Sequence, residues 1–358
     1  MRVAIDATPL IGLRTGIGVF VDGLLRSLRD DSLNETDLEI AEYTLSLKAR
    51  IYGRTRGYWV PLSAGNASLV WRTFNGPKIE KFVGDIDVVH GTNFVVPPSS
   101  SPRVISVHDL SFLNNLGRSR NSTERFDRSV RDAVDSGATV HTISEYVAQE
   151  IRDRYSAEDV RVVYPGVHPQ ATAAQSVSEK RTLVAVGATQ KRKGLLDLVN
   201  AFEVIAHLNE ELELQIIGPP GDGEGELDRS IKMLPSAIQR RVHRFGFVER
   251  QQRDQLISDA TILVHPSHYE GFGFPVLEAM AIGTPVVTTT GGAIPEIAGD
   301  AALKIDPGDG DALVDALTEL LRNEELRNTL VVAGLNRAAK FTWQNTAQGM
   351  LDLYSSLL

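Results

Sequence analysis

TILVHPSHYEGFGFPVLEAMAIGTPVVTTT, residues 261–290, carries the clearest structural pattern in the sequence. TILVHPS (261–267) is an apolar, β-rich run with the length of a buried parallel strand. PVLEAMAI (275–282) predicts a short helix, because Pro275 lacks the N–H that would be unpaired in a first helical turn. TPVVTTT (284–290) predicts the next strand. A strand, a helix and a strand in this order predict one β-α-β unit of a parallel sheet.

Two glutamates flank the loop between this strand and this helix. Gly271 and Gly273 let the loop backbone come close to a ligand above the carboxyl end of the strand, where ligands bind in open α/β sheets. Glu270 lies in the loop and Glu278 about one turn inside the helix, so both carboxylates can face one crevice. The same spacing is typical of a solvated loop glutamate beside a helix glutamate near a favourable dipole end. Both interpretations stay open at this point.

The composition limits the classes of protein to which the chain can belong. With 358 residues, 42% of them hydrophobic, the chain is too long for one compact core and is expected to form two domains. A net charge of -9 argues against a nucleic-acid partner. The lack of cysteine excludes disulfides and thiolate metal sites. Because no leader is visible and no apolar run approaches about 18 residues, we expect a cytoplasmic protein without a membrane span.

Strands and helices alternate along the first part of the chain. Helices are predicted at 16–30 and 122–137, where apolar residues recur at helical spacing. Strands are predicted at RVAIDA (2–7), LEIAEYTL (38–45), DVVHG (87–91), RVISVHD (103–109), TVHTIS (139–144) and VRVVYPG (160–166).

The alternation restarts after a polar, alanine-rich stretch at 168–181, which carries a proline and is the best candidate for a linker. The second part predicts strands at TLVAVG (182–187), LELQIIG (212–218), VHRFGF (242–247), TILVHP (261–266), PVVTTT (285–290) and ALKID (302–306). Two consecutive halves of this kind predict an α/β fold with two Rossmann-like β/α/β domains facing a central cleft.

Two loops after predicted strands are candidates for holding phosphate. TGIG (15–18) follows the first strand and opens a helix, whose N–H groups can cradle an anion. The third glycine of a dinucleotide fingerprint is missing, which disfavours a dehydrogenase. Lys191, Arg192 and Lys193 stand at a loop-to-helix junction in VGATQKRKG, where two or three cations suit a diphosphate. A solvated basic turn remains the alternative.

A histidine and an acidic pair end or precede two other predicted strands. His108 lies at the carboxyl end of the strand ISVHDL, where it can donate to a substrate hydroxyl or phosphate, although a structural histidine capping the loop is an equal alternative. Asp85 and Asp87 form a D-x-D pair like the one that holds a divalent metal in one class of sugar transferase. Since this pair precedes a buried strand, we interpret it as solvation of the strand's entry and predict no metal site.

The chain resembles the retaining glycosyltransferases of the GT-B fold, family 4, which include bacterial mannosyl-, rhamnosyl- and glucosyltransferases. The two glutamates of EGFGFPVLEAMAIGTPVV form the E-x7-E element of that family. The resemblance extends over nearly the whole chain through TGIGVFVDGLL, HGTNF, SVHDLSF, TISEY, VGATQKRKG, FGFVERQQRDQLISDATILVHPS, GGAIPEIAGDAAL and FTWQNTAQGMLDLY. It implies an acceptor domain at 1–167, a nucleotide-sugar donor domain at 168–340, and a helix at 341–358 that returns to the first domain, anchored by Trp343.

The resemblance also implies roles for individual residues. Glu270 would reach the hydroxyls of the donor sugar and Glu278 the hydroxyls of the ribose. The diphosphate would be held by Arg192 and Lys193, with Gly16 approaching the same phosphates. The remaining implied contacts are His108 beside the donor sugar, the backbone of Phe272, Gly273 and Phe274 at sugar or phosphate oxygens, and the backbone around Val248 at the base.

The implied reaction transfers a sugar with retention of anomeric configuration and without a metal or other cofactor. The cations and helix N-terminal amides would stabilise the departing diphosphate, so that Glu270 need not be a nucleophile as in retaining glycosidases. GDP-mannose is favoured as donor by family frequency, while UDP-sugars and dTDP-rhamnose remain open. The alternatives are a GT-B-fold epimerase or phosphorylase, and a non-catalytic sugar-nucleotide-binding protein.

The acceptor implied by the resemblance is a glycan or a lipid-linked glycan. Residues 47–74 form a basic, aromatic stretch with Lys48, Arg50, Arg54, Arg56, Trp59, Trp71 and Arg72. Such a stretch suits peripheral contact with anionic headgroups at the inner face of the membrane. An ordinary surface loop is the equal alternative.

Overall fold

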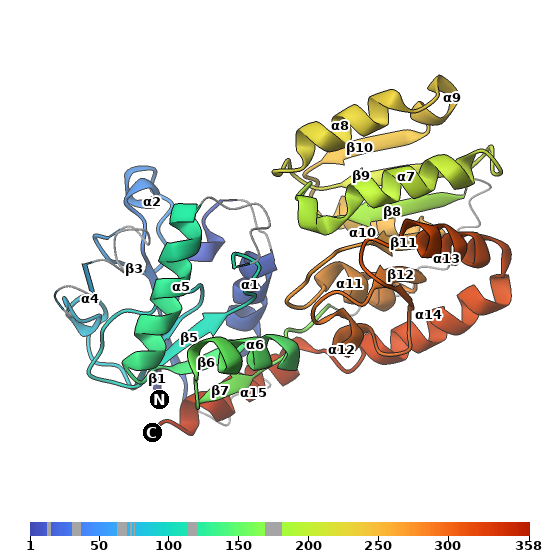
Figure 1. The fold of residues 1–358 in the computed structure, drawn as a ribbon. Helices are drawn as coiled ribbons and strands as arrows, with labels where there is room; N and C mark the ends of the chain where they lie inside the picture. The colour runs from blue at the N-terminus through green and yellow to red at the C-terminus, as the bar shows by residue number, and fades with distance from the viewer. Residues whose placement is uncertain are drawn as a thin grey trace. The chain divides into compact units, whose positions relative to one another are not determined.

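The computed structural model describes residues 1–12, 16–30, 37–62, 70, 71, 74, 76–113, 120–168 and 181–358 (Figure 1). Within these ranges the chain divides into two compact units. Unit 1 contains the described residues up to 166 together with 343–358, and unit 2 contains the described residues of 167–342. Most of the predicted linker lies outside the described residues, as do Thr15 and Arg72.

Unit 1 is built on a parallel sheet of seven strands, in the order β3-β2-β1-β4-β5-β6-β7. The strands are β1 (Arg2–Asp6), β2 (Glu39–Thr44), β3 (Tyr58–Trp59), β4 (Val88–Gly91), β5 (Arg103–Val107), β6 (Thr139–Thr142) and β7 (Val160–Val162). The six strands predicted for the first part are confirmed. The sequence missed β3, because two residues are too few to show a period.

Helices cover this sheet and complete unit 1 (Figure 1). They are η1 (Thr8–Leu10), α1 (Gly16–Leu28), α2 (Leu47–Ile51), α4 (Glu80–Val83), α5 (Arg120–Asp135), α6 (Glu145–Tyr155) and α15 (Trp343–Ser355). Helix α6 begins after Ser144, whose side chain accepts a hydrogen bond from the Val147 N–H and so satisfies one of the unpaired amides of the first turn.

The C-terminal helix α15 packs on α1 within unit 1, so the predicted return of this helix to the first domain is confirmed. A Cβ atom at Gly23 would lie 2.4 Å from the ring of Trp343, and only glycine leaves room for this indole. The Thr346 hydroxyl donates to the Tyr164 carbonyl at 2.8 Å. These contacts tie the last helix to both α1 and the segment that follows β7.

Unit 2 repeats the plan with a parallel sheet of six strands, in the order β10-β9-β8-β11-β12-β13. The strands are β8 (Thr182–Val186), β9 (Glu213–Ile217), β10 (Val242–Gly246), β11 (Ile262–His265), β12 (Val286–Thr289) and β13 (Leu303–Ile305), and all six were predicted. The helices are η3 (Lys191–Lys193), α7 (Leu195–Ala206), α8 (Glu224–Met233), α9 (Ser236–Gln239), α10 (Arg250–Ser258), α11 (Phe274–Ile282), α12 (Ile294–Ala298), α13 (Gly310–Arg322) and α14 (Glu324–Ala338).

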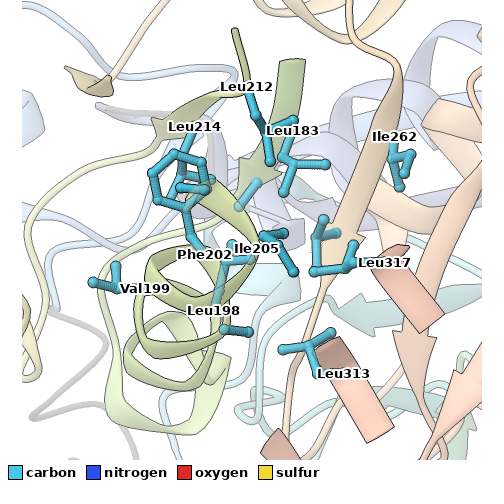
Figure 2. Close-up of a cluster of buried hydrophobic side chains, with 14 of the residues drawn as sticks. Leu183, Leu198, Val199, Phe202, Ile205, Leu212, Leu214, Ile262, Leu313 and Leu317 are labelled. Atoms are coloured by element: carbon cyan, nitrogen blue, oxygen red, sulfur yellow. The ribbon is translucent and has the colours of Figure 1, made fainter. Parts of the chain in front are cut away.

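The core of unit 2 joins the sheet to its helices. Leu198, Phe202 and Ile205 follow one another at helical spacing along α7 and are almost completely buried. They pack with Leu183 and Leu214 of the central strands (Figure 2). On this side α7 packs with α8 and α13, whereas α11 packs with α10 and α14. The pairing of α10 with α11 matters for the site, because each of these helices carries a charged residue of one ion pair.

Strand order places the loops after β8 and β11 next to each other. Strand β8 pairs with β9 on one side and with β11 on the other, so the direction of the chain's progress through the sheet reverses at β8. Loops that leave the carboxyl ends of the two strands at such a reversal diverge and leave a crevice that binds ligands.

In the part of the chain that the structure describes, no helix has the length and apolar composition to cross a membrane.

Candidate active site

The loops after β8 and β11 bring one carboxylate and two cations together. Glu270, in the loop after β11, is 6% exposed. Its carboxylate contacts the Lys193 ammonium through Oε1 and the Arg192 Nη1 atom through Oε2, the latter at 3.4 Å. The Arg192 Nη1 atom also donates to the Tyr269 carbonyl at 2.9 Å. Residues 77 or 78 positions apart in sequence therefore form one buried charge cluster.

A histidine completes this cluster. His265 is the last residue of β11, and its Nε2 atom lies 3.0 Å from Glu270 Oε1. Burial lowers the pKa of His265, and the nearby Lys193 and Arg192 lower it further against the attraction of Glu270. The imidazole is therefore neutral at pH 7, and its Nε2–H donates to the carboxylate.

The cluster keeps Glu270 ionised although it is buried. Burial is the largest influence on its pKa and would raise it, but the combined effect of Lys193, His265 and Arg192 holds the pKa well below its usual value of 4.5. A buried carboxylate that is ionised and accepts hydrogen bonds on both oxygens is an oriented acceptor. Such a group can bind hydroxyl donors without first losing a proton.

Glycines allow the surrounding loops to approach closely enough to hold this geometry. Gly292 has a φ of +67°, and a Cβ atom there would lie 2.3 Å from the Glu270 carbonyl oxygen. That carbonyl accepts a hydrogen bond from the Ala293 N–H at 2.9 Å. Gly194 has a φ of +63°, and a Cβ atom there would lie 2.0 Å from the Pro266 carbonyl oxygen. Close backbone packing thus fixes the cluster before any ligand binds.

The segment Phe272–Gly273–Phe274 leads into α11, which begins at Phe274 with Gly273 as its N-cap. Gly273 has a φ of +99°, and Pro275 occupies the first turn of the helix, as predicted. The buried ring of Phe272 packs against the rings of Phe274 and Phe341, with centroids 5.0 and 5.9 Å apart. The side chains of Phe272 and Phe274 anchor the segment. Its backbone lies at the helix N-terminus, which favours anions.

Glu278 belongs to a different charge group from Glu270. Its Oε1 atom accepts a hydrogen bond from Arg253 Nη2 at 2.9 Å, across the contact between α11 and α10. Burial raises the pKa of Glu278, and Asp254 raises it further, whereas Arg253 and Arg250 lower it. Val248, in the loop between β10 and α10, is partly buried.

The two candidates from the first part of the sequence lie in unit 1. The Nε2 atom of buried His108 donates to the Thr92 carbonyl at 2.8 Å, and its ring meets Phe20 edge-on at 5.1 Å. Burial lowers the pKa of His108, so its ring is neutral at pH 7. Gly16 is exposed at the first position of α1.

Lys191 and the acidic pair near β4 take part in other contacts. The Lys191 ammonium lies 3.1 Å from Glu226, and both side chains are about half exposed, so Lys191 stays apart from the Glu270 cluster. The carboxylate of Asp87 accepts a hydrogen bond from the Arg2 N–H at 2.6 Å. Among the described residues, no three His, Asp or Glu side chains gather as a metal site.

Sequence reasoning missed His265 and Arg253. His265 is the last residue of an apolar strand, and His108 directly follows another. The position of His265 at a carboxyl end could therefore have marked it as a candidate site residue. Arg253 carried no such signal, because its role follows from a partner 25 positions away on a neighbouring helix.

Comparisons with known proteins match both parts of the chain to glycosyltransferase families. Residues 170–337 match the family described as Glycosyl transferases group 1, and residues 15–171 match Glycosyltransferase Family 4. The chain is 26% identical over 285 residues to O-antigen chain mannosyltransferase B of Escherichia coli, which covers 75% of this chain and 74% of the relative. It is 30% identical over 284 residues to D-inositol 3-phosphate glycosyltransferase of Corynebacterium jeikeium, covering 72% and 67%.

A solved structure shows the same architecture over the full length. Anabaena HepE in complex with UDP and glucose has a TM-score of 0.75 to this chain at 18% sequence identity, and the alignment covers 100% of both chains. The two parallel α/β units and this structural similarity together show the GT-B fold. The chain therefore belongs to the group 1 glycosyltransferases, family 4, and is a glycosyltransferase.

Proposed function

We propose that the chain moves a sugar from a nucleotide-diphosphate sugar to a hydroxyl of a glycan or lipid-linked acceptor, with retention of configuration. The observation that carries the proposal is the buried Glu270 carboxylate, kept ionised between Lys193, Arg192 and His265 at the reversal point of the sheet. In this proposal unit 2 binds the donor and unit 1 supplies the acceptor side, with the predicted domain limits at 167/168 and 340/341.

In the proposed complex, different side chains contact different parts of the donor. Arg192 and Lys193 bind the diphosphate, and the amides at the start of α11 add to the stabilisation of its charge. Glu270 accepts hydrogen bonds from the sugar hydroxyls. Glu278 accepts them from the ribose, and the backbone of Val248 contacts the base. His108 and Gly16 of unit 1 contact the sugar and the phosphates, respectively.

The reaction proceeds on one face of the sugar. The bond between the anomeric carbon and the β-phosphate oxygen breaks through an oxocarbenium-like state, and the acceptor oxygen forms the new bond on the same face. The proton of the acceptor hydroxyl passes to the departing phosphate. Glu270 is a poor nucleophile for a double displacement, because Lys193 and His265 hold its Oε1 atom and Arg192 holds its Oε2 atom.

GDP-mannose is the first donor to test. Similarity to the E. coli O-antigen chain mannosyltransferase B supports a mannosyl donor. The complex of Anabaena HepE with UDP and glucose supports the class of UDP-sugars. The base contacts in the proposal come largely from backbone, which explains why the sequence leaves little record of the base.

Thermal-shift screening with GDP-mannose, UDP-glucose and dTDP-rhamnose tests donor binding. A donor at about 100 times its Kd should add roughly 2.7 kcal/mol to the apparent free energy of unfolding. The anomeric configuration of the product, measured by NMR with the donor that binds, tests retention. An inverted product contradicts the mechanism, and release of free nucleotide diphosphate without any acceptor favours an epimerase. Binding without turnover favours a sensor.

Chelation tests the metal-free chemistry. We expect transfer to continue in EDTA, because Arg192, Lys193 and backbone amides supply the positive charge that the leaving group needs. Complete loss of activity in EDTA, restored by a divalent metal, contradicts this part of the proposal.

An exposed surface of unit 1 supports a lipid-linked acceptor and peripheral contact of the protein with the inner face of the membrane. Ile51 and Tyr52, at the end of α2, are 77% and 72% exposed. Lys48, Arg50 and Arg54 are exposed beside them. Apolar side chains next to cations suit a bilayer of anionic lipids, where each cation near the surface contributes about 1 kcal/mol. Part of the predicted 47–74 stretch lies outside the described residues.

Liposome co-sedimentation tests this surface. Binding to vesicles with anionic lipid should be strong at low salt and should weaken at high salt, and Ile51→Ser with Tyr52→Ser should reduce it. Equal recovery of the wild-type protein with neutral and anionic vesicles at low salt contradicts the membrane contact.

A further inference from the structure

Arg253 links the two helices that pack together on one side of unit 2. From α10, its Nη2 atom donates to Glu278 Oε1 on α11 at 2.9 Å. The same guanidinium holds Asp254, with Nη2 and Nε lying 3.1 and 3.3 Å from Asp254 Oδ1. The side chains of Arg253 and Glu278 are only 20% and 15% exposed, so this ion pair is largely shielded from water.

The surroundings of Glu278 oppose its charge, and the net effect is a pKa above the usual value of 4.5. Burial opposes ionisation of Glu278 and raises its pKa, and the neighbouring Asp254 adds repulsion. Arg253 is the first of the groups that counter these effects, and Arg250 is a weaker one. A protonated Glu278 would lose acceptor capacity, since one of its oxygens would carry a proton.

We infer that Arg253 is a positioning residue for donor recognition, which holds Glu278 as an oriented carboxylate whose Oε2 oxygen accepts hydrogen bonds from the ribose hydroxyls of the donor. This inference rests on the proposed function, in which Glu278 binds the ribose. Arg253 itself makes no contact with the donor in this arrangement. It fixes Oε1, and the rigid carboxylate plane then sets the direction of Oε2.

The chemistry of the arginine side chain explains why this residue type suits the position. A guanidinium presents several N–H donors in one plane, so Arg253 can hold Asp254 and Glu278 at once. A lysine at this position would keep the positive charge but would lack the planar fork. Arg250 offers a matched control on the same helix, because it pairs with Asp254 at 3.3 Å and is about half exposed.

Calorimetric titration with UDP, GDP and their 2′,3′-dideoxy analogues tests the inference. The wild-type protein should bind the ribonucleotide on the order of tenfold more tightly than its dideoxy analogue, because the analogue leaves a carboxylate without its hydroxyl partners. Arg253→Ala should lose most of this ratio by weakening ribonucleotide binding, whereas binding of the dideoxy analogue should change little. Arg253→Lys should recover part of the ratio, and Arg250→Ala should keep most of it because the half-exposed Arg250 pairs with Asp254 and not with Glu278.

A double-mutant cycle shows whether Arg253 acts through Glu278. Glu278→Ala should lose the ratio, and adding Arg253→Ala should lower it no further. An Arg253→Ala protein that keeps the wild-type ratio overturns the inference, as does a further loss in the double mutant. If circular dichroism shows that Arg253→Ala is unfolded, Arg253→Met removes the charge while keeping the packing of the stem.

The same titrations separate the inference from the proposed function. A wild-type protein that binds neither UDP, GDP nor a sugar nucleotide contradicts the donor proposal. A wild-type protein that binds the ribonucleotide and its dideoxy analogue equally contradicts the assignment of Glu278 and, with it, the inference. Retained discrimination in Arg253→Ala contradicts the inference alone.

Discussion

The two units bury different kinds of polar side chain at the carboxyl ends of their central strands. Unit 1 buries neutral groups in a hydrogen-bonded chain, formed by Tyr354, His90, Ser106 and His141. Unit 2 buries charges, with Glu270 held by Lys193, Arg192 and His265. Both arrangements satisfy their polar atoms, but only the charged one offers a field that can bind a charged substrate.

The neutral chain has one direction of donation. His141 Nε2 lies 3.3 Å from the Val163 carbonyl, which can only accept. His141 Nδ1 must therefore accept from the Ser106 hydroxyl at 2.8 Å, and Ser106 accepts from His90 Nε2 at 2.6 Å. His90 Nδ1 then accepts from the Tyr354 hydroxyl at 2.7 Å. A single neutral pattern satisfies all four side chains and joins α15 to the sheet.

The two arrangements differ in what their burial costs. A neutral chain costs little to bury and specifies which groups meet, so it suits the attachment of α15. A buried ion cluster is expensive because its ions lose their hydration. Unit 2 retains such a cluster at the reversal point of its sheet, and the proposed binding of an anionic donor gives a reason for retaining it.

Removing the lysine of the charged cluster should have the largest effect. Lys193→Ala should lower the rate of transfer by about 100- to 1,000-fold, because a charge that stabilises the leaving group is lost. The measurement is steady-state transfer with the donor found by thermal shift, on protein shown to be folded by circular dichroism. A wild-type rate in this variant would sink the diphosphate assignment.

Breaking the neutral chain should destabilise unit 1 without affecting the chemistry of unit 2. Tyr354→Phe leaves the buried Nδ1 atom of His90 without its donor and should cost about 1–3 kcal/mol of unfolding free energy. The three tryptophans, Trp59, Trp71 and Trp343, all lie in unit 1, so urea denaturation followed by tryptophan fluorescence reports on this unit.

Tyr52→Phe is the matched control for this measurement, because Tyr52 is 72% exposed and should be insensitive to loss of its hydroxyl. A denaturation midpoint of Tyr354→Phe equal to that of Tyr52→Phe would show that the neutral chain contributes nothing to stability.

The buried neutral histidines should make the free energy of unfolding fall in acid. Burial lowers the pKa of His141 to about 3 and that of His90 well below 6.5, so the unfolded chain takes up these protons first as pH falls. The stability they contribute is complete above pH 6.5 and is lost as pH falls from there toward 3. Asp6, whose pKa burial raises to about 6, opposes part of this loss.

The variant His141→Gln isolates one of these histidines. Between pH 6 and 4 its unfolding free energy should depend on pH less steeply than that of the wild type, by up to about 1.4 kcal/mol per pH unit. His207→Gln, at an exposed position in unit 2, should leave the slope of tryptophan-detected unfolding unchanged. Parallel slopes for His141→Gln and the wild type would show that His141 is not buried in its neutral form.

The smallest effect is expected at the cation beside the charged cluster. Lys191→Ala removes an ion pair with Glu226 whose side chains are 59% and 45% exposed, so stability should change by about 0–1 kcal/mol. Transfer should continue at close to the wild-type rate, because Lys191 does not contact Glu270. A loss as large as that of Lys193→Ala would extend the site to the whole Lys191–Lys193 turn.

The order of the elements and the family could be predicted from the sequence. Apolar period and turn residues are local properties of the chain, so six strands in each part, the α11 helix after Pro275 and the final helix could all be predicted from neighbouring residues. The two-residue strand β3 could not, because its pairing with β2 depends on a distant segment and leaves no period.

The partners of the charged groups could not be predicted from the sequence and follow from the packing of distant elements. The spacing of Glu270 and Glu278 suggested two carboxylates facing one crevice, yet each contacts different cations. The physical reason is the order of strands and helices in space. Strand β8 lies beside β11 and brings Lys193 to Glu270, while α10 packs on α11 and brings Arg253 to Glu278. Such pairings depend on long-range packing, which a local pattern does not encode.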